Sequence, residues 1–258
     1  MKAVQERKQS VVSKRLEGKV VLVTGGSRGI GAGIALRLAE EGAQVAITYA
    51  KNKGAAEKVL AEIKELGVNA AAFHADSALG EQGQLIDDVI KHFGKIDILV
   101  NNAGVFEGAP INSLNLDHYE RVFAVNVKGV IATTAAAVNK ISDGGRIINL
   151  SSVAAKGSMA GYSIYSATKA AVDTLTKVWA QELGSRKITV NAVAPGTTAS
   201  DMYEAALPDE VKNALPAKTA LGRVGQPDDI AAVVAFLASE DGRWVTGQTI
   251  IADGGLLF

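Results

Sequence analysis

Lys19–Gly31 has the sequence KVVLVTGGSRGIG, and this stretch decides the fold. Val20 to Val23 form an unbroken apolar run, which is typical of a parallel strand covered by helices on both faces. Gly25, Gly29 and Gly31 lack the Cβ atoms that would hinder a sharp turn and the close approach of a ligand. The apolar periodicity after Gly31 predicts a helix, whose first N–H groups face the turn. Such a helix start attracts phosphate and predicts a nucleotide site, although a merely tight turn has the same pattern.

The composition favours a compact α/β enzyme over a nucleic-acid-binding protein. The chain has 258 residues, 48% of them hydrophobic, which is enough for one substantial core. Its 27 basic and 27 acidic side chains balance, so no basic field would gather nucleic acid. Cysteine is absent and His74, His92 and His118 are scattered, so we expect neither disulfides nor a protein-bound metal.

The chain start carries no sign of a membrane or secretory segment. Residues 1–15 are mostly polar and precede the first strand, so we interpret them as an extension before a single domain at 16–258. They lack the apolar core of a signal peptide, and no apolar run reaches the roughly 18 residues that span a bilayer. We therefore expect a cytoplasmic protein that needs no membrane.

Apolar strand patterns alternate with helical patterns along the whole chain. Strands are expected at 20–23, 44–48, 70–74, 96–100, 146–150, 188–192 and 249–252. Helices are expected from the glycine turn to about 41 and at 55–66, 85–93, 117–140, 162–183 and 228–239. The alternation predicts a Rossmann-type doubly wound α/β fold, with a parallel seven-stranded sheet in the order 3-2-1-4-5-6-7. Prolines and weak periodicity at 197–223 predict a helical flap that acts as a lid.

Polar and small residues follow several of these strands. Asp76 and Ser77 follow the third strand, Asn101 to Gly104 the fourth, and Ser151 and Ser152 the fifth. Ligands of open parallel sheets bind at the carboxyl ends of the strands, so we expect these residues to border the site.

The segment YSATK places Tyr165 and Lys169 one turn apart on the same helix face. A phenol titrates near about 10, and a neighbouring ammonium favours the phenolate, so this tyrosine could exchange a proton with a carbonyl oxygen. Ser152, thirteen residues before Tyr165, could donate to an oxygen that gains charge. Taken singly, the pair could be ordinary helix neighbours and the serine a turn cap.

Together these motifs resemble the short-chain dehydrogenase/reductase family. The resemblance covers T-G-x-x-x-G-x-G at 24–31, NNAG at 101–104, Asn126 in VFAVNVKG, Y-x-x-x-K at 165–169 and Pro195-Gly196. It implies that Tyr165 is the general acid/base, that Ser152 polarises a carbonyl, and that Lys169 lowers the pKa of the tyrosine and holds the nicotinamide ribose. It assigns Asn126 to a water-mediated proton relay; from the residues alone, this asparagine could equally bond within its own helix.

The resemblance also implies a set of cofactor contacts. Ile30 would offer its amide to the pyrophosphate, Asn102 and Gly104 would line the adenosine side, and Asp76 would bond the adenine. Thr198 and Ser200 match positions at the carboxamide and pyrophosphate end. The other expected contacts are Gly25, Ser27, Arg28, Gly29, Gly31, Tyr49, Ala50, Lys51, Ser77, Ala103, Tyr165, Lys169, Pro195 and Gly196.

The second strand predicts NADP(H) rather than NAD(H). An acidic side chain at its end would bond a ribose 2′-hydroxyl and repel a 2′-phosphate, but Thr48, Tyr49 and Ala50 stand there, followed by Lys51. Arg28 in the glycine turn can reach the same place with a planar fork suited to phosphate.

We therefore predict an NADPH-dependent reductase of a small-molecule ketone, which can also oxidise the alcohol. The overall pattern is closest to 3-oxoacyl-acyl-carrier-protein reductases and related carbonyl reductases. Arg186 matches one basic carrier-protein position of those enzymes, but Asp143 occupies the other, which disfavours an acidic partner. A nucleotide-sensing protein without turnover is the alternative from another class; an epimerase or dehydratase would need a larger C-terminal region.

Apolar surface on the helices 117–140 and 162–183, and at the chain end 256–258, predicts a homotetramer.

Overall fold

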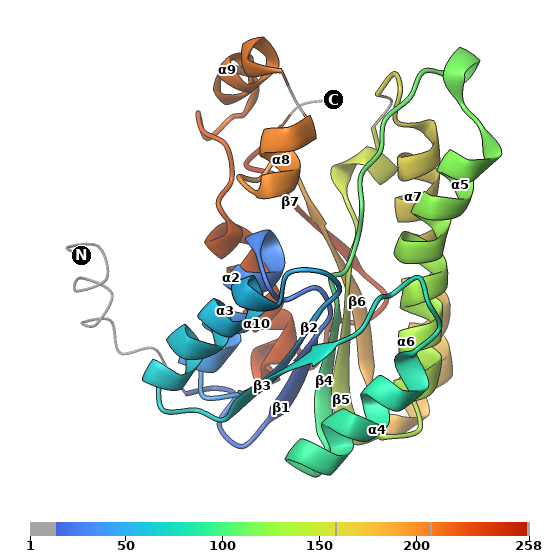
Figure 1. The fold of residues 1–258 in the computed structure, drawn as a ribbon. Coiled ribbons are helices and arrows are strands. Elements are labelled where there is room, and N and C mark those ends of the chain that lie inside the picture. The colour runs from blue at the N-terminus through green and yellow to red at the C-terminus, as the bar shows by residue number, and fades with distance from the viewer. Residues whose placement is uncertain (1–13, 158, 207, 257–258) are drawn as a thin grey trace.

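The computed structural model describes residues 14–157, 159–206 and 208–256 (Figure 1). Its described strands form one seven-stranded parallel sheet in the order β3-β2-β1-β4-β5-β6-β7, which confirms the predicted fold class and strand order. The strands are β1 Val20–Val23, β2 Gln44–Tyr49, β3 Ala70–His74, β4 Ile96–Asn101, β5 Ile141–Leu150, β6 Thr189–Pro195 and β7 Thr249–Ala252. Most of the expected extension, residues 1–13, lies outside the described residues.

Helices cover both faces of the sheet, as Figure 1 shows. One face carries α2 Gly29–Glu40, α3 Lys53–Glu65 and α10 Pro227–Ala238. The other carries α4 Gln82–Phe93, α5 Leu116–Phe123, α6 Gly129–Ala137 and α7 Ser163–Leu183. Short 3-10 turns lie at Ile111–Ser113, Val153–Ala155, Gly184–Arg186 and Glu240–Gly242.

The unbroken apolar run of β1 follows from this double cover. Val21 and Val23 belong to the core cluster on the α2 and α10 side, whereas Leu22 belongs to the cluster that includes Ile86 of α4. Alternate side chains of a strand point to opposite faces, so a strand between two helical layers needs apolar residues at every position.

The predicted single helix at 117–140 was wrong in two respects. A π-helical segment, Ala124–Lys128, joins α5 to α6, and α6 ends at Ala137. β5 begins at Ile141, five residues before its predicted start, because Ile141 pairs with Ile96 ahead of a register shift in β4. β6 likewise extends to Pro195, which pairs with Ala252 of β7.

The expected flap contains two short helices, α8 Asp201–Ala206 and α9 Asp209–Lys218, with Pro216 inside the second. Both lie beyond the carboxyl end of β6, above the glycine turn (Figure 1). In the part of the chain that is described, no helix has the length and apolar character needed to cross a membrane.

Candidate active site

Backbone carbonyls and short side chains hold the glycine turn after β1. Gly25 adopts a positive φ of 64° and donates its N–H to the Thr48 hydroxyl at 2.9 Å. The Thr24 hydroxyl accepts the N–H groups of Asn102 and Ala103, each at 3.0 Å. The Asn102 side-chain amide donates to the carbonyls of Thr24 at 2.9 Å and Gly25 at 3.0 Å. Asn102, expected to line the adenosine side, therefore fixes the turn with its side chain.

The turn fits a bound pyrophosphate. A Cβ on Gly31 would lie 2.3 Å from the Gly25 carbonyl oxygen, so only glycine lets the helix start this close to the turn. The side chain of Arg28, the N-cap of α2, makes no capping hydrogen bond, and the first helical bond runs from Ala32 N–H to the Arg28 carbonyl. The N–H groups of Gly29, Ile30 and Gly31 thus remain available to an anion at the positive end of the helix dipole.

The residues expected at the 2′-phosphate lie at the carboxyl end of β2 and, for Arg28, at the start of α2. The Tyr49 ring lies edge-on to His74 with centroids 5.6 Å apart, and the His74 ring nitrogen Nε2 lies 2.9 Å from the Ala50 carbonyl oxygen. Lys51 is exposed. Arg28 pairs with Asp201 of α8 at 3.2 Å, and 67% and 69% of the two side chains are exposed. This pair joins the glycine turn to the flap.

The segment after β6 also lies against the glycine turn. A Cβ added to Gly29 would be 3.3 Å from Cβ of Ser200, so the two backbones lie close together. The Ser200 hydroxyl donates to the Thr198 carbonyl at 3.3 Å and accepts the Tyr203 N–H at 3.2 Å. β6 ends at Pro195, and Gly196 follows it immediately before this segment.

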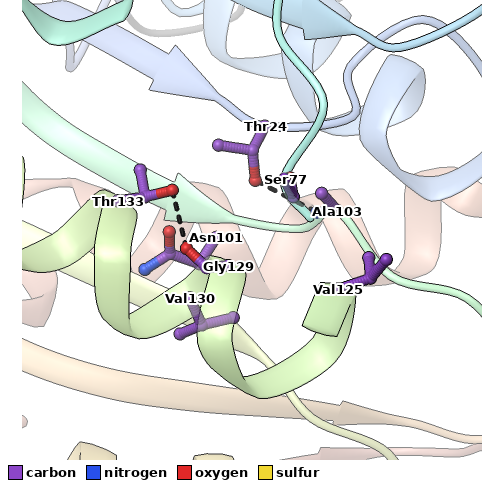
Figure 2. Close-up of a pocket in the computed structure, with 8 residues that line it drawn as sticks. All are labelled: Thr24, Ser77, Asn101, Ala103, Val125, Gly129, Val130 and Thr133. Carbon is purple, nitrogen blue, oxygen red and sulfur yellow. Dashed lines mark hydrogen bonds between the residues drawn. The ribbon is translucent and has the colours of Figure 1, made fainter. Parts of the chain in front are cut away.

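A small cavity lies beneath the NNAG segment, between the ends of β1 and β4 and the helical layer (Figure 2). In it the Thr133 hydroxyl donates to the Gly129 carbonyl at 2.8 Å. Its lining residues are Thr24, Ser77, Asn101, Ala103, Val125, Gly129, Val130 and Thr133. Ser77 thus borders this cavity, while the adjacent Asp76 carboxylate accepts the Ala78 N–H at 2.9 Å.

Ser152, Tyr165 and Lys169 meet beyond the carboxyl end of β5. Ser152 caps the 3-10 turn Val153–Ala155, where its hydroxyl accepts the Ala154 N–H at 3.2 Å. Ser152 is thus a turn cap, which was the alternative reading of the sequence, and its side chain also forms a hydrogen bond with that of Tyr165. The Lys169 ammonium is buried, donates to the Leu150 carbonyl at 2.8 Å and lies 5.7 Å from the Tyr165 ring centroid.

Burial has the largest effect on the pKa values of Tyr165 and Lys169. Desolvation raises the pKa of Tyr165 above its ordinary value, while the hydrogen bond from Ser152 opposes the rise. Desolvation lowers the pKa of Lys169 to about 8, against a raising effect of Asp173. Burial thus acts against the fall in pKa expected for the tyrosine, and Tyr165 keeps its proton at neutral pH.

Asn126 lies in the π-helical segment and bonds across to neighbouring elements. Its side-chain oxygen accepts the Val105 N–H at 2.8 Å, and its amide donates to the Val105 carbonyl at 2.9 Å and the Thr168 hydroxyl at 3.2 Å. The alternative in which Asn126 bonds within its own helix is wrong for its side chain. A role in proton relay stays a prediction.

An aromatic wall, Phe106 and Tyr162, stands beside the tyrosine. The Phe106 ring lies 5.0 Å from the Tyr165 ring and 4.7 Å from the Tyr162 ring, edge-on to both. The sequence analysis missed Phe106, although its position two residues after NNAG places it at the same strand end. It named Thr48 only as a position that lacks an acid and missed its role, which is to hold the glycine turn from the neighbouring strand through its hydroxyl.

Comparison with known proteins agrees with this geometry. A family model described as enoyl-(acyl carrier protein) reductase matches residues 25–257. The structure of a short chain dehydrogenase from Burkholderia cenocepacia in complex with NADP is similar, with a TM-score of 0.89, 45% identity, and coverage of 94% of this chain and 99% of that one. The chain belongs to the short-chain dehydrogenase/reductase family.

Two relatives of this short-chain dehydrogenase/reductase match along nearly their full lengths. An uncharacterized oxidoreductase of Methylorubrum extorquens is 47% identical over 245 residues, which cover 94% of this chain and 99% of the relative. A probable tetrahydroxynaphthalene reductase of Zymoseptoria tritici is 44% identical over 260 residues, covering 95% and 96%. The chain is thus an oxidoreductase by family.

Proposed function

We propose that this protein is an NADPH-dependent ketone reductase that also oxidises the corresponding alcohol. The observation that carries the proposal is the meeting of Ser152, Tyr165 and Lys169 at the carboxyl end of β5, close to a glycine turn that fits a pyrophosphate. When bound, the cofactor supplies a hydride to the carbonyl carbon. The chain must supply the rest: a place for the carbonyl oxygen and a proton for it.

Each of the three side chains has one task in this proposal. The Ser152 hydroxyl donates to the carbonyl oxygen and holds it beside Tyr165. Tyr165 then donates its phenolic proton to that oxygen as negative charge develops there. Burial raises the pKa of Tyr165, so the phenol is protonated and ready to donate at neutral pH. The Lys169 ammonium stabilises the phenolate that remains and would hold the nicotinamide ribose when the cofactor is bound.

Two features support NADPH over NADH. No acidic side chain follows β2 at Tyr49 to Lys51, where it would repel a 2′-phosphate. Arg28 offers its guanidinium after β1, where an exposed ion pair with Asp201 holds it. The Burkholderia relative, in complex with NADP, agrees with this preference.

A free ketone suits this chain better than one carried on acyl carrier protein. Arg186 donates to Asp143 at 2.8 Å and to the carbonyls of Val138 and Ile141, each at 2.6 Å. Its charge is therefore neutralised by a neighbour rather than offered to an acidic partner. The aromatic wall of Phe106 and Tyr162 gives an apolar boundary suited to a hydrophobic ketone.

We also propose a cytoplasmic homotetramer. Exposed apolar side chains lie on the helices expected to pair and on the last strand: Leu116, Tyr119, Ile131, Val178 and Ile251. Burial of such surface about two-fold axes gives closed symmetry. Residues 257 and 258 of the apolar chain end lie outside the described residues. Sedimentation at micromolar concentration tests the proposal, which a monomeric mass would refute.

The function is tested by NADPH absorbance in the presence of a ketone panel. The panel should contain small aliphatic ketones, aryl ketones and a 3-oxoacyl thioester, each assayed with NADPH and NADH. We expect faster oxidation of NADPH with at least one free ketone than with the thioester. NADPH binding without oxidation by any ketone or thioester would favour the nucleotide-sensing alternative, and preference for the thioester would favour a carrier-protein reductase.

A further inference from the structure

Asp173 is a buried carboxylate one helical turn after Lys169. Its side chain is 8% exposed, and Lys156 lies 3.2 Å away, from Nζ to Oδ2. The other oxygen, Oδ1, is buried and has no hydrogen-bond partner among the described residues. A carboxylate in such a place is costly unless nearby positive charge compensates it.

Two ammonium groups can compensate this carboxylate. Lys156 approaches from the segment after the 3-10 turn that Ser152 caps, and 40% of its side chain is exposed to water. Lys169 precedes Asp173 by four residues on α7, so the two lie on the same helix face. Lys169 is buried and held by the Leu150 carbonyl, where solvent screens its charge little. The Asp173 carboxylate therefore interacts with two ammonium groups, that of the partly exposed Lys156 and that of the buried Lys169.

Other elements packed on α7 bring polar but uncharged groups to this region. Asn126 bonds Thr168, Asn149 bonds Thr176, and the Ser151 hydroxyl donates to the Lys169 carbonyl. Among the charged groups, His118 and Arg121 of α5 contact Glu107, and Arg186 of the 3-10 turn after α7 contacts Asp143. Asp117 and Glu120 of α5 and Lys128 of the π-helical segment are exposed, so water screens their charges. Tyr162 and Tyr165 lie at the start of α7, and Asp173 is the carboxylate whose charge raises the pKa of Lys169 against the effect of burial.

We propose that Asp173 is a positioning residue of the reductase, whose carboxylate sustains the positive charge of Lys169 behind Tyr165 while Lys156 competes for the same carboxylate. Burial alone would favour the neutral amine, which could neither stabilise a phenolate nor bind a ribose hydroxyl as a charged donor. The inference rests on the proposed ketone reduction. It adds the source of the charge on which that reduction depends.

The first test measures Lys169 directly in the cofactor-free protein. The chain is labelled with 13C at lysine Cε, the Lys169 signal is assigned by its loss in Lys169→Ala, and its shift is followed with pH. The parent signal should titrate at a pH of about 8. Asp173→Asn should lower this midpoint by about one pH unit, the size expected for loss of a nearby opposite charge. Asp173→Glu should restore it at least in part.

Lys156→Met separates this role from a simple structural ion pair. Removal of Lys156 leaves the whole field of Asp173 to Lys169, so the midpoint should rise, opposite to its fall in Asp173→Asn. A structural bridge would make both variants change alike. Asp143→Asn is the matched control, since it removes an exposed carboxylate at the opposite end of β5 and should leave the midpoint unchanged.

The pH dependence of ketone reduction gives a second, kinetic test. Burial lowers the pKa of Lys169 to about 8 and Asp173 opposes this fall, so Lys169 is charged below its midpoint and ketone reduction should fall as pH rises through it. The alkaline limb of kcat should move to lower pH in Asp173→Asn and to higher pH in Lys156→Met.

An unchanged Lys169 midpoint in both variants, or shifts of both midpoints in the same direction, overturns the inference. If Asp173→Asn does not fold, the rise expected in Lys156→Met still decides. A parent that titrates as expected but reduces no ketone refutes the proposed function instead.

Discussion

The two halves of the sheet's carboxyl edge are built in different ways. The half around β1 and β2 depends on glycines, whose lack of a side chain lets α2 approach the turn. There the Asn102 side-chain amide donates to backbone carbonyls. The half around β4 to β6 is made by buried polar side chains, such as the Asn101 side-chain amide donating to the Asn149 side-chain oxygen Oδ1 at 2.9 Å. Added side-chain atoms should therefore disturb the first half, whereas loss of a hydrogen-bond partner should disturb the second. Substitutions should therefore fail differently in the two halves.

The largest effect is expected in the second half, from Tyr165→Phe. Loss of the phenolic proton should cut turnover by at least about a hundredfold, the lower range for a positioned acid/base, with fold and cofactor binding kept. Steady-state kinetics and NADPH fluorescence titration measure the two separately. Tyr162→Phe, which keeps the same aromatic packing on Phe106, is the control and should retain turnover within several-fold. Activity of Tyr165→Phe near the parent value would sink the mechanism.

Lys169→Ala should affect both turnover and cofactor affinity. The ammonium serves the tyrosine and the ribose, so we expect each quantity to fall by at least about tenfold, as for loss of a charged hydrogen bond. If cofactor affinity falls while kcat stays unchanged, Lys169 has no role toward Tyr165. The Leu150 carbonyl, which loses its donor, also predicts a lower melting temperature for this variant.

Gly31→Ala tests the first half. The new Cβ would lie 2.3 Å from the Gly25 oxygen and 2.4 Å from the Asn102 amide nitrogen, so the helix must move away from the turn. We expect unfolding free energy to fall by about 1–3 kcal/mol, as for overpacking, together with weakened cofactor binding. Gly83→Ala in α4, where an added Cβ meets nothing within 4 Å, should leave both nearly unchanged. Equal behaviour of the two variants in chemical denaturation would contradict the packing argument.

The last and most selective effect is expected from Arg28→Ala, which should change the binding of one cofactor because the cofactor keeps its other contacts. NADPH binding should weaken by at least about tenfold through loss of a charged phosphate contact, and NADH binding should stay nearly constant. Asp201→Asn frees Arg28 from its ion pair and should not weaken NADPH. Isothermal titration with both cofactors measures the difference. Equal loss for the two cofactors, or a parent that prefers NADH, would overturn the assignment.

Local patterns predicted much of the sheet and the site. The order of elements, the glycine turn and the one-turn spacing of Tyr165 and Lys169 depend on neighbours in sequence, so periodicity and motif are sufficient for them. Boundaries were less accurate where distant pairing decided them. The start of β5 depends on Ile96 across the sheet, and no residue near Ile141 signals it. The π-helical segment at Ala124–Lys128 likewise falls inside an uninterrupted helical pattern.

The sequence by itself determined a doubly wound sheet and the order in which catalytic residue types follow the glycine turn. Only the tertiary structure decided the charge state of those residues. Burial raises the pKa of Tyr165 and lowers that of Lys169, and the field of Asp173 opposes the second shift. The physical reason is that desolvation and charge compensation act through space, among side chains from α7, the end of β5 and the segment carrying Lys156. Sequence spacing alone does not define those distances.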